Sequence, residues 1–208
     1  AEELDSRRWD ALADRLRANK GGLGDLGGGN HFLDALAPYE GEALHFLVHT
    51  GSRNESGHVD GLVDRPDAFD EEFDRVVAWA AANRATIHEE IEKVFGPVEL
   101  VLDLPHNTYE ALPDGGAIIR KGSVRLRPGE LSVIPSHMTG DVALIRATHQ
   151  VTGVLNSLSH GTGRKMSRGD CKPLADRFDF GMLRRSVLLP AGLHDASLRT
   201  EGPYAYRD

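Results

Sequence analysis

Residues 117–145, AIIRKGSVRLRPGELSVIPSHMTGDVALI, contain four short apolar segments that are separated by glycine, proline and polar residues. Short apolar segments bounded by such turn residues are typical of β-strands. The stretch therefore predicts four short strands, at residues 117–120, 124–126, 131–134 and 142–145.

The chain before this stretch alternates between helix and strand signals. Apolar runs at residues 99–104 and 44–48 predict two more strands, the first of them buried. Residues 70–95 place most of their apolar side chains on one side and three acids in the first turn, where the helix dipole favours anions. This pattern predicts a long helix that ends at Gly96. Residues 4–16 predict a shorter amphipathic helix that stops at the glycines after Lys20.

Taken together, these elements predict an α+β fold. We interpret residues 1–208 as a single α+β domain, because no repeat, low-complexity tract or linker divides them. Several of the predicted strands end in polar loops. Loops held by a rigid sheet are where catalytic groups usually lie.

The composition is that of an ordinary globular protein, with 40% hydrophobic and 27% charged residues. No apolar run is long enough for a membrane helix, and the acidic first residues do not suggest a secretory signal. The single cysteine, Cys171, excludes an internal disulfide and fits a reducing cytoplasm, so we expect a cytoplasmic protein without a membrane partner. The formal net charge of −8 argues against a generally basic surface but allows a local basic groove.

Four histidines have glycine or asparagine close to them: His31, His49, His106 and His160. Imidazole is a metal ligand, a proton carrier or a nucleophile, and glycine lets the backbone approach a metal or phosphate. Taken singly, His31 is equally well explained as a turn residue, and His49 and His106 are better explained as strand ends. Together, these three can bind a divalent transition metal such as Mn, Zn, Fe or Ni.

Two basic segments suit phosphate binding. Residues 159–168, SHGTGRKMSR, surround His160 with hydroxyl groups, glycines and three cations, a composition that suits oxyanion binding. A histidine in this setting can attack phosphorus. Residues 119–125 contain three more cations. Each segment alone is also explained as a solvated basic loop.

The chain resembles the RtcB-type RNA ligases in five motifs that follow one another in register. These motifs are GGGNHF at 27–32, HTGSR at 49–53, His-Asn with a following glutamate at 106–110, RKG at 120–122 and SHGTGRKMSR at 159–168. With an aromatic match at Tyr206, the resemblance covers about 180 positions, from Gly27 to Tyr206.

The resemblance implies a mixed α+β fold in which short strands deliver histidine-bearing loops to a central cleft and helices pack outside. It implies an enzyme that uses GTP and manganese, with two metal ions in the family, to join RNA ends in RNA repair or tRNA splicing. His160 would attack the α-phosphate of GTP and carry GMP. The GMP would pass to an RNA 3′-phosphate, made by opening a 2′,3′-cyclic phosphate, and a 5′-hydroxyl would then form the phosphodiester.

The resemblance also assigns binding roles. His31, His49 and His106 would bind the manganese ions. Residues implied in nucleotide binding are Asn30 and Asn107 at the phosphates, Lys121 and Arg164 as further contacts, Asp34 and Tyr206 near the guanine, and Ser159, Gly161 and Gly163 in the phosphate-binding segment.

The chain also departs from the family pattern. The family's earlier Asp-x-Gly-Cys metal motif and its final lysine-glycine are not present in these 208 residues, so we expect a fragment of a longer chain. Asp34 replaces a glutamate, and the loop at 135–140 replaces Pro-Gly-Ser-Met-Gly, which indicates a divergent branch. Two alternatives to the ligase stay open: an RNA-end-binding homologue without ligase activity, and a nucleotidyl transferase that uses another nucleotide.

Overall fold

The computed structural model describes residues 5–41, 43–52, 55, 65, 68–193 and 198–207. The chain folds into two compact units. Unit 1 comprises residues 1–99 and 190–192, and unit 2 comprises residues 100–189 and 193–208. Both units combine helices with antiparallel strands, which confirms the predicted α+β class. The RtcB-like arrangement and the single catalytic domain stay predictions.

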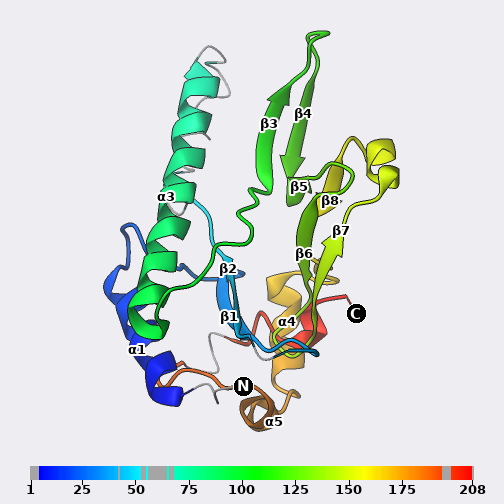
Figure 1. Ribbon diagram of the computed structural model, residues 1–208. Helices are drawn as coiled ribbons and strands as arrows, with labels where there is room; N and C mark the ends of the chain where they lie inside the picture. Colours follow the sequence, from blue (N-terminus) through cyan, green and yellow to red (C-terminus); the bar gives the residue numbers. More distant parts are fainter. Residues whose placement is uncertain are drawn as a thin grey trace. The chain divides into compact units, whose positions relative to one another are not determined.

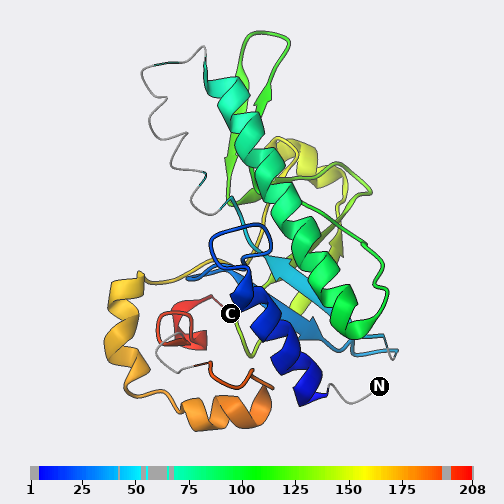
Figure 2. The ribbon, with the colours of Figure 1, turned by 90° about the vertical axis from the view of Figure 1, so that its left-hand side faces the viewer.

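The described part of unit 1 contains two helices, α1 (Ser6–Ala18) and α3 (Phe69–Phe95), which pack against each other (Figure 2). Helix α1 begins where the Asp5 carboxylate accepts a hydrogen bond from the Arg7 amide, and α3 ends at Gly96, whose φ of 88° favours glycine. Both predicted helices are confirmed, although Leu4 lies outside the described residues.

A two-stranded antiparallel sheet completes unit 1. Its strands are β1 (Phe32–Leu36) and β2 (His45–His49), and Phe32 lies opposite His49. The sheet packs on the helices through Leu33, which joins Ile87 and Ile91 of α3 in the core. Strand β2 is the strand predicted at 44–48. Strand β1 was not predicted, because Asp34 interrupts its apolar pattern.

Among its described residues, unit 2 contains three antiparallel strand pairs (Figure 1). The pairs are β3 (Asn107–Ala111) with β4 (Ala117–Lys121), β5 (Ser123–Arg125) with β8 (Ser157–Ser159), and β6 (Leu131–Pro135) with β7 (Val142–Arg146). The four strands predicted within residues 117–145 are all confirmed, with ends that differ by at most one residue. Between β4 and β5 there is a single residue, Gly122.

Short helices accompany these strands. They are η3 (His149–Val154), α4 (Arg168–Ala175), α5 (Phe180–Ser186) and η4 (Pro203–Ala205). One core of unit 2 forms between β5 and η3, around Leu126 and Val151, and a second forms around Phe180 and Leu183 of α5. Within the part of the chain that the structure describes, no helix has the length and apolar character needed to cross a bilayer.

The buried strand predicted at residues 99–104 is wrong. The segment has no regular secondary structure, and Leu100 and Val101 are 63% and 61% exposed. Only Leu104 packs against a core, the one around Val124. An apolar run becomes a strand only when a neighbouring strand pairs with its backbone, and no strand pairs with this segment among the described residues.

Candidate functional site

In unit 1 the two predicted metal-binding histidines are neighbours. The ring centroids of His31 and His49 are 5.7 Å apart, and the ring planes make an angle of 79°. The strand register explains this contact, because His49 ends β2 opposite Phe32 and His31 directly precedes Phe32. The antiparallel pair therefore brings both imidazoles to the same end of the sheet.

A buried side chain of α3 holds the loops on which these histidines lie. Asn83 is fully buried, and its Oδ1 accepts a hydrogen bond from the Gly24 amide at 2.7 Å. Its Nδ2 donates to the Asp25 carbonyl at 3.1 Å and to Thr50 Oγ1 at 3.4 Å. Because these partners lie in the glycine-rich loop before His31 and directly after His49, Asn83 fixes both loops to one helix. Sequence reasoning missed this residue, whose only signal was a polar side chain on an apolar helix face.

The hydrogen bond of His49 sets its tautomer. Nδ1 lies 2.7 Å from the backbone carbonyl oxygen of Asn30. A carbonyl only accepts, so Nδ1 carries the proton and donates it, and the lone pair of the neutral ring is on Nε2. Metal-binding histidines are commonly oriented in this way by a hydrogen bond at the other ring nitrogen.

Asp34 lies in the middle of β1, opposite Leu47. Burial raises the pKa of the Asp34 carboxyl from 3.8 to about 6. A carboxylate removed from water without compensation is costly, so the native state binds the proton more tightly than the unfolded chain does. Asp34 therefore stabilises the fold fully below its unfolded pKa, and this contribution is lost as the pH rises through the folded pKa.

We expect Asp34→Asn to raise the free energy of unfolding by about 1–2 kcal/mol at pH 8 and by close to zero at pH 4. The amide is neutral at both values, so it removes the cost of burying the charge only where wild-type Asp34 is ionised. Urea unfolding at the two pH values measures the difference. The exposed Glu40→Gln serves as the control, and an Asp34→Asn effect that is equal at both pH values would contradict the account.

In unit 2 the other two histidines stack. The ring centroids of His106 and His160 are 4.1 Å apart, with an interplanar angle of 20°. Strands β4 and β5 follow each other through Gly122, with β3 paired to the first and β8 to the second. His106 directly precedes β3 and His160 directly follows β8. The two rings therefore meet beside Gly122.

Gly122 organises this cluster through its backbone. Its carbonyl oxygen accepts hydrogen bonds from His160 Nδ1 at 2.6 Å and from the His160 amide at 3.3 Å. Its amide donates to Asn107 Oδ1 at 3.0 Å. The φ angle is +70°, and a Cβ here would lie 3.3 Å from Cε1 of His160. A side chain at this position would therefore strain the backbone and press on the imidazole.

These contacts define the proton positions on both rings. The Gly122 carbonyl requires the proton on Nδ1 of His160, so the lone pair of the neutral ring is on Nε2. Nδ1 of His106 lies 3.3 Å from Asn107 Oδ1, which is also an acceptor, and the same assignment follows. Such rings suit nucleophilic attack or metal ligation through Nε2.

Each unit, taken by itself, offers imidazole groups of the kind that bind a transition-metal ion. Neutral imidazole is the preferred protein ligand for such ions, and both His49 and His106 have the Nδ1 hydrogen bond that orients the ring. The partners are a backbone carbonyl in one case and an amide oxygen in the other. The ligand roles of His31, His49 and His106 stay predictions.

The segment after His160 adopts a tight turn against the loop that begins at Pro135. Ser159 Oγ donates to the Gly161 carbonyl at 2.7 Å, and the Thr162 amide donates to the Pro135 carbonyl at 3.1 Å. A Cβ on Gly161 would lie 3.3 Å from the same carbonyl oxygen, so the chain passes closely there. Gly163, with φ of +83°, turns the chain next, and its carbonyl accepts from the Arg207 amide at 3.0 Å.

Arg164 and Tyr206 are brought together at an isolated β-bridge. The Arg164 guanidinium donates to Glu201 Oε2 and to the Thr200 carbonyl, each at 2.7 Å, and it lies 5.1 Å from the Tyr206 ring centroid. Burial and a hydrogen bond to Glu201 raise the pKa of Tyr206 to about 12. This network ties residues 164–168 to residues 200–206, and the nucleotide roles of Arg164 and Tyr206 stay predictions.

Glu201 was missed from the sequence. It accepts hydrogen bonds from Arg164, Arg168 and Tyr206 and is 9% exposed. Nothing in its local sequence, Thr-Glu-Gly, marks it as the partner of distant cations. Among the other predicted residues, Lys121 is exposed at the end of β4, opposite Asn107, and Arg53 of the second motif lies outside the described residues.

Residues 67–208 match the family model described as tRNA-splicing ligase RtcB. The curated relatives include an Escherichia coli protein named RNA-splicing ligase RtcB2, which is 32% identical over 80% of this chain and 52% of the relative. RNA-splicing ligase RtcB of Escherichia coli K12 is 27% identical over 89% of this chain and 55% of its own length.

A third relative, tRNA-splicing ligase RtcB of Nanoarchaeum equitans, is 25% identical over 99% of this chain and 58% of its own length. The chain thus spans somewhat more than half the length of the curated relatives it matches. The comparison with solved structures gave no significant match. Because the family model matches more than half of the chain, the chain belongs to the tRNA-splicing ligase RtcB family.

Proposed function

We propose that this chain carries the catalytic histidine of a GTP- and manganese-dependent RNA ligase. The observation that carries the proposal is the hydrogen bond between His160 Nδ1 and the Gly122 carbonyl, because it leaves the lone pair on Nε2. His160 also begins a turn of glycines, hydroxyl groups and cations, which suits a triphosphate substrate. The relatives' names, which describe RNA-splicing and tRNA-splicing ligases, agree with this function.

In the proposed first step, Nε2 of His160 attacks the α-phosphorus of GTP. A phosphorus–nitrogen bond forms, the bond to the bridging oxygen of the β-phosphate breaks, and pyrophosphate leaves with the electron pair. The proton on Nδ1 stays in its hydrogen bond with the Gly122 carbonyl. That carbonyl stabilises the positive charge that the ring acquires during the attack.

In the proposed second step, an RNA 3′-phosphate oxygen attacks the same phosphorus and releases His160. A 5′-hydroxyl then attacks the activated RNA phosphate, GMP leaves, and a phosphodiester forms. The 3′-phosphate itself arises from a 2′,3′-cyclic phosphate by addition of water. These RNA ends and the reaction order come from the family resemblance, and a role in RNA repair or tRNA splicing belongs to the same proposal.

His31, His49 and His106 are the proposed metal ligands. A bound Mn²⁺ would neutralise negative charge on the triphosphate and on the leaving group. The protein's part is to orient the imidazoles, which the Asn30 carbonyl does for His49 and the Asn107 amide does for His106. Asn30, Asn107, Lys121 and the 159–164 segment are the proposed phosphate contacts.

One observation favours an RNA-end-binding homologue without ligase activity. In the loop at 135–140, which differs from the family pattern, a Cβ on Gly140 would lie 2.3 Å from Ser136 Oγ and 2.9 Å from Cε1 of His137. Side chains therefore fill the inside of this loop, where the family pattern has glycine. The two functions differ in one product, because only the ligase forms a covalent nucleotide.

The nucleotide requirement tests the proposal. The chain is incubated with Mn²⁺ and, separately, with each of the four α-labelled ribonucleoside triphosphates, with EDTA as the metal-free control. We expect a covalent label from GTP that EDTA abolishes. Labelling by a different triphosphate would instead identify a nucleotidyl transferase with another specificity, and no label from any of the four would favour the RNA-end-binding function.

We expect Gly122→Ala to lower the rate of covalent labelling by about 10- to 100-fold, which corresponds to roughly 1.4–2.7 kcal/mol in the barrier. The added methyl group lies against the His160 ring and disturbs its hydrogen bond. Gly129→Ala is the matched control, since Gly129 has a similar φ of +88° and no atom within 4 Å of its Cβ position. Equal labelling rates for the two variants would show that the contact with His160 is unimportant.

A further inference from the structure

The outer face of β5 carries a second cationic site. We infer that a pocket between β3, β4, β5 and η3 binds consecutive phosphates of the RNA substrate, at a place other than the histidine cluster. This inference rests on the proposed function, because it names how the same unit holds its RNA.

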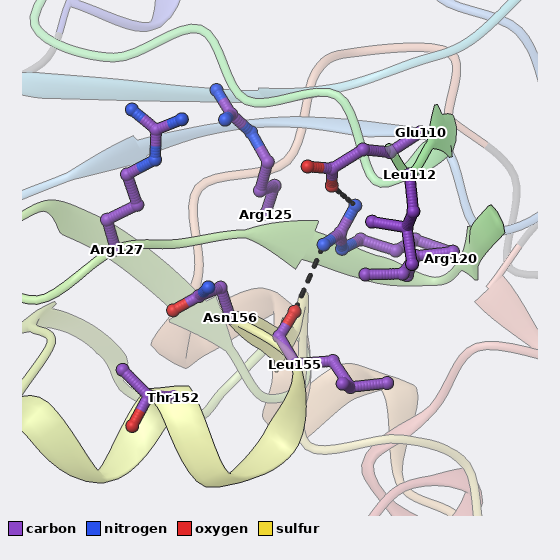
Figure 3. A pocket seen from close by; sticks show the side chains of 9 residues that line it. Glu110, Leu112, Arg120, Arg125, Arg127, Thr152, Leu155 and Asn156 are labelled. Carbon is purple, nitrogen blue, oxygen red and sulfur yellow. Dashed lines mark hydrogen bonds and ion pairs between the residues drawn. The ribbon is translucent and has the colours of Figure 1, made fainter. Parts of the chain in front are cut away.

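The alternation along β5 and the two residues that follow it creates the cationic face. In the sequence Ser123-Val-Arg-Leu-Arg127, Val124 and Leu126 are 3% and 1% exposed, whereas Arg125 and Arg127 are exposed. Successive side chains of an extended chain point to opposite faces, so the two arginines share the outer face. Figure 3 shows both guanidinium groups extending in the same direction from the wall of the pocket.

The pocket has a volume of about 230 Å³ and a mainly polar lining. Polar side chains reach it from several elements of unit 2: Glu110, Arg120, Arg125, Arg127, Thr152 and Asn156. A space of this size accommodates one phosphate group with part of its ribose, so the next phosphate of the RNA would lie on the exposed arginine face beside it.

Arg120 is not available to bind an anion, because its guanidinium group is already paired. It is 3% exposed, and it donates to Glu110 at 2.7 Å and to the Leu155 carbonyl at 3.1 Å (Figure 3). It also donates to Ser157 Oγ at 2.9 Å. The Glu110 carboxylate is therefore neutralised by a buried guanidinium. Arg125 and Arg127 lie close enough to lower the pKa of Glu110 further, after the dominant hydrogen bond from Arg120.

The guanidinium groups of Arg125 and Arg127 form no hydrogen bond or ion pair with any residue that the structure describes. They are thus two exposed cations on one pocket wall without a hydrogen-bonded or ion-paired acid among the described residues, in a chain whose formal net charge is −8. Neighbouring acids would cancel the field of a merely solvated basic surface. Here Glu110, the one acid in the pocket lining, already has its own partner, and the Glu130 carboxylate accepts a hydrogen bond from the backbone amide of Arg127 and not from its guanidinium group. The field inside the pocket therefore favours an anion.

The pocket wall also offers an unused hydrogen-bonding group. The Oδ1 atom of Asn156 is buried and has no hydrogen-bond partner among the described residues. Leu155 and Asn156 have φ of 55° and 49°, a left-handed conformation that is strained for leucine. This turn fixes Asn156 beside the pocket, where its amide can bind a polar group of a ligand, such as a ribose hydroxyl.

The spacing of the two arginines favours a chain of phosphates. Residues two apart on an extended strand are separated by roughly 7 Å, so each guanidinium can bind a separate phosphate in bidentate fashion. RNA backbone and the triphosphate of GTP share this chemistry, and the experiment below separates the two sources.

The test compares the chain with its Arg125→Gln/Arg127→Gln variant in binding a fluorescent single-stranded RNA with a 3′-phosphate, over a series of salt concentrations. We expect about a 10-fold higher Kd at low salt, and a slope of log affinity against log salt that is smaller by about 1.4, because each lost phosphate contact removes about 0.7. Arg125→Lys/Arg127→Lys keeps the charge and should keep the slope. Arg7→Gln/Arg8→Gln, on the exposed face of α1, removes the same net charge and should bind RNA as the unaltered chain does.

Unchanged RNA affinity and slope in the glutamine variant would overturn the inference. So would a loss of GTP affinity that is larger than the loss of RNA affinity, since the pocket would then serve the nucleotide. If thermal unfolding shows that the double variant is not folded, Arg127→Gln alone is used, with an expected slope change of about 0.7. Absence of a GMP adduct on the unaltered chain would contradict the proposed function instead, and the RNA comparison would still decide this inference.

Discussion

Replacing His160 by alanine is expected to abolish covalent labelling by GTP while the chain stays folded. In the proposed mechanism the imidazole supplies the attacking Nε2, and the stacked ring of His106 is proposed as a metal ligand rather than as a second nucleophile. Covalent catalysis has no residual pathway when its nucleophile is removed, so the labelled product should fall below detection. The variant is expected to stay folded because His160 is only partly buried and lies outside the cores of unit 2.

Two controls sharpen this experiment. His149→Ala removes an exposed histidine at the start of η3 and should label normally. Circular dichroism and thermal unfolding of His160→Ala establish that the variant is folded. Label that persists in a folded His160→Ala protein would show that another residue is the nucleophile.

Replacing His49 or His106 by alanine is expected to lower manganese affinity and labelling together. Loss of a hydrogen-bonding partner of a ligand typically costs roughly 10- to 100-fold in metal affinity, and loss of the ligand itself should cost more. Manganese binding is measured by calorimetry and by metal content after dialysis, and labelling is measured at saturating manganese. Labelling should recover only partly, because an altered ligand set also changes the geometry around the ion.

Each variant has a matched control substitution in its own unit. His45 is exposed at the first position of β2, whereas His49 ends the same strand, so His45→Ala is the control for His49→Ala. His149→Ala again serves unit 2. Manganese binding that is unchanged in both His49→Ala and His106→Ala would remove the proposed ligand role of these histidines, whatever happened to labelling.

The elements of the fold that have strong periodicity could be predicted from the sequence. Helix α3 follows from its apolar face and its terminal glycine, and the strands within residues 117–145 follow from apolar segments between turn residues. Strand β1 could not be predicted, because Asp34 breaks the pattern and lies in a setting that raises its pKa. The error at residues 99–104 has the opposite cause, since apolar composition alone does not provide a strand partner.

In the candidate site, too, some residues could be predicted from the sequence and others could not. The histidines were recognisable from their neighbours, because glycine, asparagine and cations are unusual around structural imidazoles. The groups that orient two of them were not, because the Asn30 and Gly122 carbonyls belong to the backbone and have no side-chain signature. Asn83 and Glu201 act on residues far away in the sequence, and such partners follow from the tertiary structure alone.

The most direct test of the central claim is peptide mass mapping after incubation of the chain with manganese and GTP. The account predicts one modified peptide, which carries the mass of GMP on His160, and fragmentation that places the phosphorus–nitrogen bond on Nε2 of its imidazole. GMP on a different residue, or no modified peptide under conditions where the chain is folded and binds manganese, would contradict the claim that His160 is the nucleophile of a ligase.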